Sequence, residues 1–290
     1  MISPTKSRDR QLATFGALTA AFLVLLSAAY ASSRDSNILT LLMLTPAASV
    51  LVSCLVAGDG IRQLPLAPRL RGNLPWYAAA WLLPALAAFA GAALYFLVFP
   101  RDFDPLGSQL AEASGVEGMG DYISTVVPSV LAAVLVNPIP GLLPCLGEEL
   151  AWRGYLLPAL SERMPRARAA LATGVAWGVW HAPIVAMGYN YGAGHPVAGV
   201  LAMTAFCAVM GCISGFLFFR TRTVWAPVAF HAAVNGIAMY APSALLMRAG
   251  AHPDPFIGPD LTGIIGGAGF VVLAVICFAA LRRMRTGAEN

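Results

Sequence analysis

The stretch GEELAWRG, from Gly147 to Gly154, places two adjacent glutamates and an arginine inside a run of apolar residues that extends from about 123 to 160. A charged residue at the centre of a membrane helix costs roughly 2.5–3.5 kcal/mol on insertion scales. Three such residues within six positions are therefore expensive. They predict a buried ion pair, a chemical site, or both.

The composition around this stretch is that of an integral membrane protein. The chain has 290 residues, of which 58% are hydrophobic and only 11% are charged. Soluble domains carry about twice that charged fraction, so the apolar excess faces lipid instead of filling one oversized core. All five cysteines fall within apolar runs, at spacings that match neither a disulfide framework nor a zinc ribbon, and we interpret them as small core residues.

The apolar runs predict an all-α polytopic fold with about eight transmembrane helices around a polar intramembrane cavity. Each run is long enough to cross about 30 Å of hydrocarbon. We expect the spans at roughly 13–32, 37–58, 75–99, 123–160, 169–187, 196–219, 224–247 and 261–281. The fourth run is too long for one simple crossing and contains Pro138, Pro140 and Pro144, so we expect a kinked or broken helix whose second part begins near Gly141.

The distribution of basic residues predicts the orientation. Fourteen of the 18 basic residues fall in the two terminal segments and in alternate loops, whereas the other loops hold only Arg34, Arg101 and Arg248. The positive-inside rule then places both termini in the cytoplasm. The net charge of +4 is explained by this topology, and no basic run indicates a nucleic-acid partner. A single lysine among the basic residues, with abundant alanine and glycine, points to a bacterial protein in the inner (plasma) membrane.

Within GEELAWRG, the two glutamates have different predicted environments. Glu149 and Arg153 stand at i and i+4 on one helix face, so they can pair and neutralise each other. Glu148 lies about 100° around the helix from Glu149 and is free for another role. An unpaired carboxylate inside a membrane helix is a functional hypothesis by default.

Two histidines lie in a similar apolar setting, His181 in the fifth predicted span and His231 in the seventh, with Asn235 one turn after His231. Counting residues from the predicted cytoplasmic ends places Glu148 and His181 both roughly 18 Å deep, and His231 roughly 10–15 Å deep. We therefore expect the three groups to meet in one layer on the cytoplasmic side. His231 and Asn235 also fit a plainer interpretation, as hydrogen-bonding groups between helices.

A carboxylate and two imidazoles in a protected cavity suit acid–base chemistry. Glu148 together with His181 can deprotonate a water that attacks a peptide carbonyl, and His231 and Asn235 can donate hydrogen bonds to the developing oxyanion. A proton-coupled transporter uses similar buried groups, although we detect no inverted repeat.

Three ordered elements carry a family resemblance: E-E-x-x-x-R at 148–153, an aromatic residue four positions before a histidine at 177–181, and H-x-x-x-N at 231–235. Together they resemble the CAAX-protease and bacteriocin-processing family of intramembrane proteases, also called the ABI family and typified by type II CAAX prenyl endopeptidases. The resemblance implies that Glu148 and His181 activate water, that His231 and Asn235 form the oxyanion hole, and that Glu149 and Arg153 support the site.

The resemblance leaves several points open. Trp177 stands where the family more often has phenylalanine, and we expect it to support the site by changing the width of the cavity. Trp152, Trp180 and Trp225, like Trp177, are interpreted as packing or interfacial anchors rather than substrate platforms. Family members have been described both as metalloproteases and as metal-independent glutamate proteases.

Glu148, His181 and His231 could ligate zinc, but no H-E-x-x-H motif is present, so we expect no cofactor.

The predicted organisation has three parts: three helices and an outer loop at 1–122, a CAAX-protease-like catalytic core at 123–247, and a final helix with a basic tail at 248–290. The partners expected from this organisation are membrane lipid and a peptide or membrane-protein substrate. The predicted function is an intramembrane endopeptidase. The alternatives are a proton-coupled transporter, or an inactive relative that acts as an immunity or scaffold protein.

Overall fold

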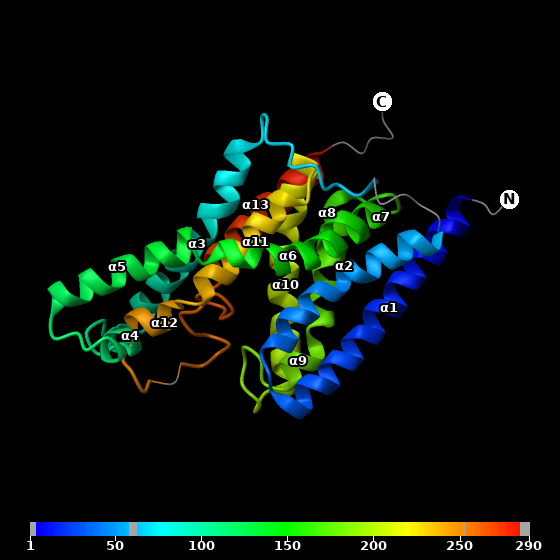
Figure 1. The fold of residues 1–290 in the computed structure, drawn as a ribbon. Coiled ribbons are helices and arrows are strands. Elements are labelled where there is room, and N and C mark those ends of the chain that lie inside the picture. The colour runs from blue at the N-terminus through cyan, green and yellow to red at the C-terminus, as the bar shows by residue number, and fades with distance from the viewer. Residues whose placement is uncertain (1–3, 58–62, 252, 285–290) are drawn as a thin grey trace.

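The computed structural model describes residues 4–57, 63–251 and 253–284, and these residues form an all-α polytopic membrane protein (Figure 1). The described residues contain no β-sheet, only two isolated bridges that pair Phe103 with Met247 and Ser108 with Arg248. The predicted fold class is therefore confirmed.

Three long helices make up the first part of the chain. They are α1 (Pro4–Ser33), α2 (Asn37–Ala57) and α3 (Leu74–Val98). A short turn joins α1 to α2, and the two helices run side by side in Figure 1. The loop after α3 carries a 3-10 turn, Pro100–Asp102, and the short helix α4 (Gln109–Ala113).

The long apolar run is broken, as predicted, although the break lies earlier than expected. Helix α5 (Met119–Leu135) ends before a turn at 136–137, and α6 (Pro138–Ala151) begins at Pro138 rather than near Gly141. A proline at the first position of a helix loses no hydrogen bond, because the N–H group at that position has no partner within the helix. The prolines therefore start α6.

The GEELAWRG stretch ends in an unusual helical turn. Residues Trp152–Leu156 form a π-helical turn, η3, in which the N–H of Leu157 donates to the carbonyl oxygen of Trp152. Helix α7 (Leu157–Ser161) continues after it. Such wide turns are rare and often lie at functional sites.

The second half of the chain packs around one long helix, α10 (Pro196–Thr221). Its neighbours in the sequence are α8 (Arg166–Trp180), α9 (Ala182–Ala186), α11 (Trp225–Ala238), α12 (Pro242–Leu246) and α13 (Ala268–Arg283). Helices α8 and α10 approach very closely. A Cβ atom added to Gly174 would lie 2.6 Å from the carbonyl oxygen of Cys207, and one added to Gly211 would lie 2.6 Å from the Cα of Gly174. The small residues Gly174 and Gly211 therefore allow the two helices to pack closely.

Some predicted spans end elsewhere in the structure. The fifth predicted span is interrupted at His181, which separates α8 from α9, and the seventh ends at Ala238. The last helix begins at Ala268 instead of near 261, because the glycine-rich residues 254–267 form a chain of turns. In the described part of the chain, five helical stretches are long and apolar enough to cross a membrane. The count of eight crossings stays a prediction.

Loops that were predicted to share a side of the membrane do lie together. At one end, Arg163 pairs with Asp9, and the Asn73 side chain donates to the carbonyl oxygen of Thr221 at 3.1 Å. At the opposite end, Arg34 donates to the carbonyl oxygen of Met187 at 3.1 Å. We call the first end, with loops 63–73, 162–165 and 222–224, the basic end, and the other the outer end. That the basic end faces the cytoplasm stays a prediction.

Candidate active site

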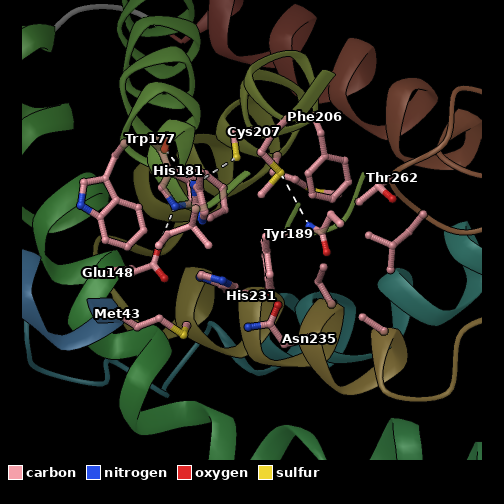
Figure 2. A pocket seen from close by; sticks show the side chains of 18 of the residues that line it. Met43, Glu148, Trp177, His181, Tyr189, Phe206, Cys207, His231, Asn235 and Thr262 are labelled. Carbon is pink, nitrogen blue, oxygen red and sulfur yellow. Dashed lines mark hydrogen bonds between the residues drawn. The ribbon is translucent and has the colours of Figure 1, made fainter. Parts of the chain in front are cut away.

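A cavity of about 270 Å³ lies between α2, α6, α8, α10 and α11. Its wall includes all four residues predicted to be catalytic, Glu148, His181, His231 and Asn235. Figure 2 shows their side chains around one common space, although they come from three separate helical segments. The expectation that these groups meet is therefore confirmed by the geometry.

Glu148 is buried in the wall of this cavity, with only 1% of its surface exposed. The indole N–H of Trp177, on α8, donates to its Oε2 atom at 2.5 Å. A hydrogen bond to an ionised acceptor is stronger than one between neutral groups. This bond holds the carboxylate of Glu148 beside the helix that carries His181.

Glu149 lies behind the cavity wall and is fully buried. Its Oε1 atom accepts hydrogen bonds from Arg153 at 2.7 Å and from Nδ1 of His231 at 3.0 Å. The guanidinium carbon of Arg153 also lies 4.5 Å from the centre of the Trp177 ring. The predicted pairing of Glu149 with Arg153 is confirmed, and neither residue lines the cavity.

Both imidazoles are oriented by their Nδ1 atoms. Nδ1 of His181 lies 2.9 Å from the carbonyl oxygen of Trp177, and Nδ1 of His231 lies beside the Glu149 carboxylate. Because both partners are acceptors, each Nδ1 carries a hydrogen. Both rings line the cavity, and His231 also hydrogen-bonds with Cys145.

Asn235 completes the constellation from one turn further along α11. One hydrogen of its side-chain amide is directed at Sγ of Cys145, with 3.6 Å between the nitrogen and the sulfur. Sulfur is a weak acceptor, and the amide nitrogen has a second hydrogen. Asn235 therefore has a donor available to a group in the cavity.

The comparisons with known proteins agree with this geometry. Residues 123–237 match the family model described as type II CAAX prenyl endopeptidase Rce1-like. An 84-residue stretch is also 36% identical to a protein named CAAX prenyl protease 2 from Methanococcus maripaludis. The aligned stretch makes up 29% of this chain and 27% of that protein. We call this matched region, residues 123–237, the CAAX-protease-like domain. The chain thus spans about a quarter of the relative's length, and helices α1–α3 lie outside the matched region.

The sequence prediction underestimated how much two tryptophans of the CAAX-protease-like domain contribute to the cavity. Trp177 and Trp180 both line the cavity, and Trp177 contacts Glu148 directly, so it supports the site by hydrogen bonding as well as by size. In contrast, Trp225 is anchored away from the cavity through an N–H donated to the carbonyl oxygen of Leu66 at 2.7 Å. Trp177 lies four residues before His181, which is about one helical turn, and this spacing was the sequence signal that could have placed Trp177 in the site.

The prediction also missed lining residues in α10, in the loop before α10 and outside the domain. They are Cys207, whose Sγ lies 3.9 Å from Nδ1 of His181, Tyr189, which lies between Glu148 and Thr262 in Figure 2, and three further polar residues: Asn190, Asp260 and Thr262. Among the described residues, no group of three or more His, Cys, Asp or Glu side chains is arranged to hold a metal ion. The expected independence of metal stays a prediction.

Proposed function

We propose that this chain is an intramembrane endopeptidase that hydrolyses a peptide bond of a membrane-associated peptide or protein. The observation that carries the proposal is the meeting of Glu148, His181, His231 and Asn235 in one cavity of a CAAX-protease-like domain. A buried carboxylate with two oriented imidazoles can move protons where bulk water does not compete.

In the proposed reaction, Glu148 accepts a proton from a water molecule, with Nε2 of His181 as the second acceptor for that water. The resulting hydroxide adds to the carbonyl carbon of the scissile bond. The proton then passes from Glu148 to the leaving nitrogen as the carbon–nitrogen bond breaks, so the products are a carboxylate and an amine. General acid–base help of this kind contributes roughly 10² to 10⁴ in rate.

The oxyanion of the tetrahedral intermediate accepts hydrogen bonds from His231 and Asn235. Nδ1–H of His231 already donates to Glu149, so its Nε2 serves the oxyanion only when this ring is doubly protonated. The ion pair of Glu149 with Arg153 holds that ring in place. One donor to an oxyanion is worth roughly 10² to 10³ in kcat.

The test is peptide cleavage by the purified protein in nanodiscs, read by mass spectrometry on a diverse peptide library that includes prenylated C-terminal peptides. The prenylated arm is included because the relative's name refers to such substrates. Wild-type protein is compared with Glu148→Gln and with Glu112→Gln, a matched change at an exposed glutamate in α4. Cleavage by wild type and Glu112→Gln but not by Glu148→Gln is expected.

Cleavage that persists in Glu148→Gln would remove Glu148 from the mechanism, and no cleavage by folded wild-type protein would count against a peptidase acting on these substrates. A chelator arm, with metal analysis of the purified protein, tests the expected independence of metal. Activity that falls with chelator and returns on addition of zinc would assign a ligand role to Glu148, His181 and His231.

A further inference from the structure

The cavity extends from Glu148 towards the outer end of the molecule. Its wall includes Tyr189 and Asn190 from the loop before α10, and Asp260, Leu261 and Thr262 from the loop before α13. No residue of the basic-end loops lines it. In Figure 2, Thr262 lies on the opposite side of the space from Glu148. A substrate that occupies the cavity therefore contacts residues beyond the CAAX-protease-like domain.

The segment 254–267, which supplies Asp260 and Thr262, is held firmly in place. Within it, backbone N–H groups of residues 264, 265 and 266 donate to carbonyl oxygens of residues 256, 257 and 258. Tyr191 donates its hydroxyl to the carbonyl oxygen of Thr262 at 3.2 Å, and its ring stacks on Phe256 with 5.2 Å between centres. The segment also packs tightly on α3, because a Cβ on Gly91 would lie 1.8 Å from a carbonyl oxygen of Gly266.

The carboxylate of Asp260 is held in place by hydrogen bonds and can accept more of them. Its Oδ1 accepts the backbone N–H of Ser243 at 2.9 Å, and its Oδ2 accepts the Ser243 hydroxyl at 2.7 Å. A carboxylate has about four acceptor positions, so further donors can be bound. The side chain is half-buried in the cavity wall.

The charges of the cavity wall favour a cationic ligand. The lining residues include two carboxylates, Glu148 and Asp260, and no lysine or arginine. Two positive charges lie near the catalytic groups, Arg153 and the doubly protonated ring of His231, and both are paired with Glu149 behind the wall. Apolar side chains, among them Phe206, Phe230 and Val234, complete the wall. A cleft lined by one sign of charge with apolar walls concentrates ions of the opposite sign.

We propose that Asp260 is a specificity-determining residue for the endopeptidase described above. It binds a cationic group of the substrate, either a basic side chain or a free amino terminus, which is separated from the scissile bond by apolar residues. The preferred substrate is then a short apolar peptide segment with a positive charge on the part that reaches the outer end. This inference rests on the proposed function, but it concerns binding and can be tested without cleavage.

The test measures peptide binding to Glu148→Gln protein in nanodiscs by fluorescence anisotropy. This variant keeps Asp260 as the acidic side chain of the lining and prevents turnover. Leucine- and alanine-rich peptides that differ only in one terminal residue, Lys, Gln or Glu, are compared at low and high salt. Each is made with a free and with an acetylated amino terminus, which separates the two sources of positive charge.

We expect the Lys peptide, or the peptide with a free amino terminus, to bind about tenfold more tightly than its neutral counterpart at low salt. Asp260→Asn should remove this preference, and Asp260→Lys should reverse it in favour of the Glu peptide. Ser243→Ala, which removes a hydrogen-bond partner but keeps the carboxylate, should retain the preference. Asp254→Asn, at an exposed acid of the same segment that does not line the cavity, should also retain it.

Two results would overturn the proposal. One is equal binding of the Lys, Gln and Glu peptides, and of the free and acetylated forms of each, by the Glu148→Gln protein with Asp260 intact, which requires no change at Asp260 or Ser243. The other is loss of the preference in Ser243→Ala to the same extent as in Asp260→Asn, which would make Asp260 a structural residue of the loop. A charge preference without any cleavage would support this site while contradicting the peptidase, so the two failures are distinguishable.

Discussion

Trp177 donates its indole N–H to the carboxylate of Glu148, and this bond joins α8 to α6 across the wall of the cavity. The carbonyl oxygen of the same tryptophan accepts from Nδ1 of His181. One residue therefore sets the positions of both groups that are proposed to activate water. The guanidinium of Arg153 on the ring of Trp177 ties this arrangement to the buried ion pair.

Trp177→Phe tests whether this bond positions Glu148. The change keeps an aromatic ring and removes the N–H, and a hydrogen bond to a charged group is worth about 1.5–3 kcal/mol. We expect kcat/KM in the peptide assay to fall by about 10- to 100-fold. Trp180→Phe is the matched control, because Trp180 also lines the cavity but its indole nitrogen has no hydrogen-bond partner in the described structure. Equal losses in the two variants would show that ring size, and not the N–H, is what matters.

Arg153→Met should destabilise the fold strongly. It leaves the carboxylate of Glu149 buried without its closest counter-charge, and breaking one partner of a buried pair costs about 3–5 kcal/mol. Thermal unfolding in detergent, followed by circular dichroism, measures the loss. The double variant Glu149→Gln/Arg153→Met should lose less than the sum of the two single variants, because it leaves no uncompensated charge of this pair. Additive losses would mean that the pair is not coupled in the folded protein.

Asn235→Ala should lower kcat by about 10²- to 10³-fold with little change in KM, because the donor acts on charge that develops only in the transition state. Steady-state kinetics on any cleaved library peptide provide the measurement. Val234→Ala, at the neighbouring residue of the same cavity wall, removes packing but no donor and should keep most of the kcat. A rise in KM alone for Asn235→Ala would place this residue in substrate binding.

Gly174→Ala should reduce both stability and activity. The added Cβ would lie 2.6 Å from the carbonyl oxygen of Cys207, so α8 and α10 must separate, and overpacking of this kind costs about 1–3 kcal/mol. Since α8 contains Trp177 and ends directly before His181, the separation also moves residues proposed to act in catalysis. Gly120→Ala is the control, because nothing lies within 4 Å of a Cβ at that helical position. A melting temperature unchanged from wild type would show that the helices accommodate a methyl group.

Local spacing explains which parts of the site were predictable. The i, i+4 spacing of Glu149 and Arg153 predicts their pairing because a single helix carries both residues. Counting residues from helix ends also brings Glu148, His181 and His231 to a common cavity. The bond from Trp177 to Glu148 depends on how two helices are rotated about their axes, which residue counts do not determine.

The outer end of the cavity was not predictable for a different reason. Residues 261–267 are apolar and glycine-rich, so hydropathy assigns them to the last membrane helix, whereas they form turns that place Asp260 and Thr262 against the cavity. Their hydrogen bonds run between positions eight residues apart within the segment, a pattern with no periodic signal in the sequence. The start of α6 was also hard to predict, because any of three prolines could begin the helix.

The π-helical turn at Trp152–Leu156 allows the residues before it and the residues after it to face different parts of the protein. It accommodates one residue more than an α-helical turn, so the faces of the helix before and after it are out of phase. Glu148 can therefore face the cavity while Leu157, with none of its surface exposed, packs into the core on the far side of the turn. As a result, the residues of α6 that face the cavity and the residues of α7 that face the core need not follow one continuous helical periodicity.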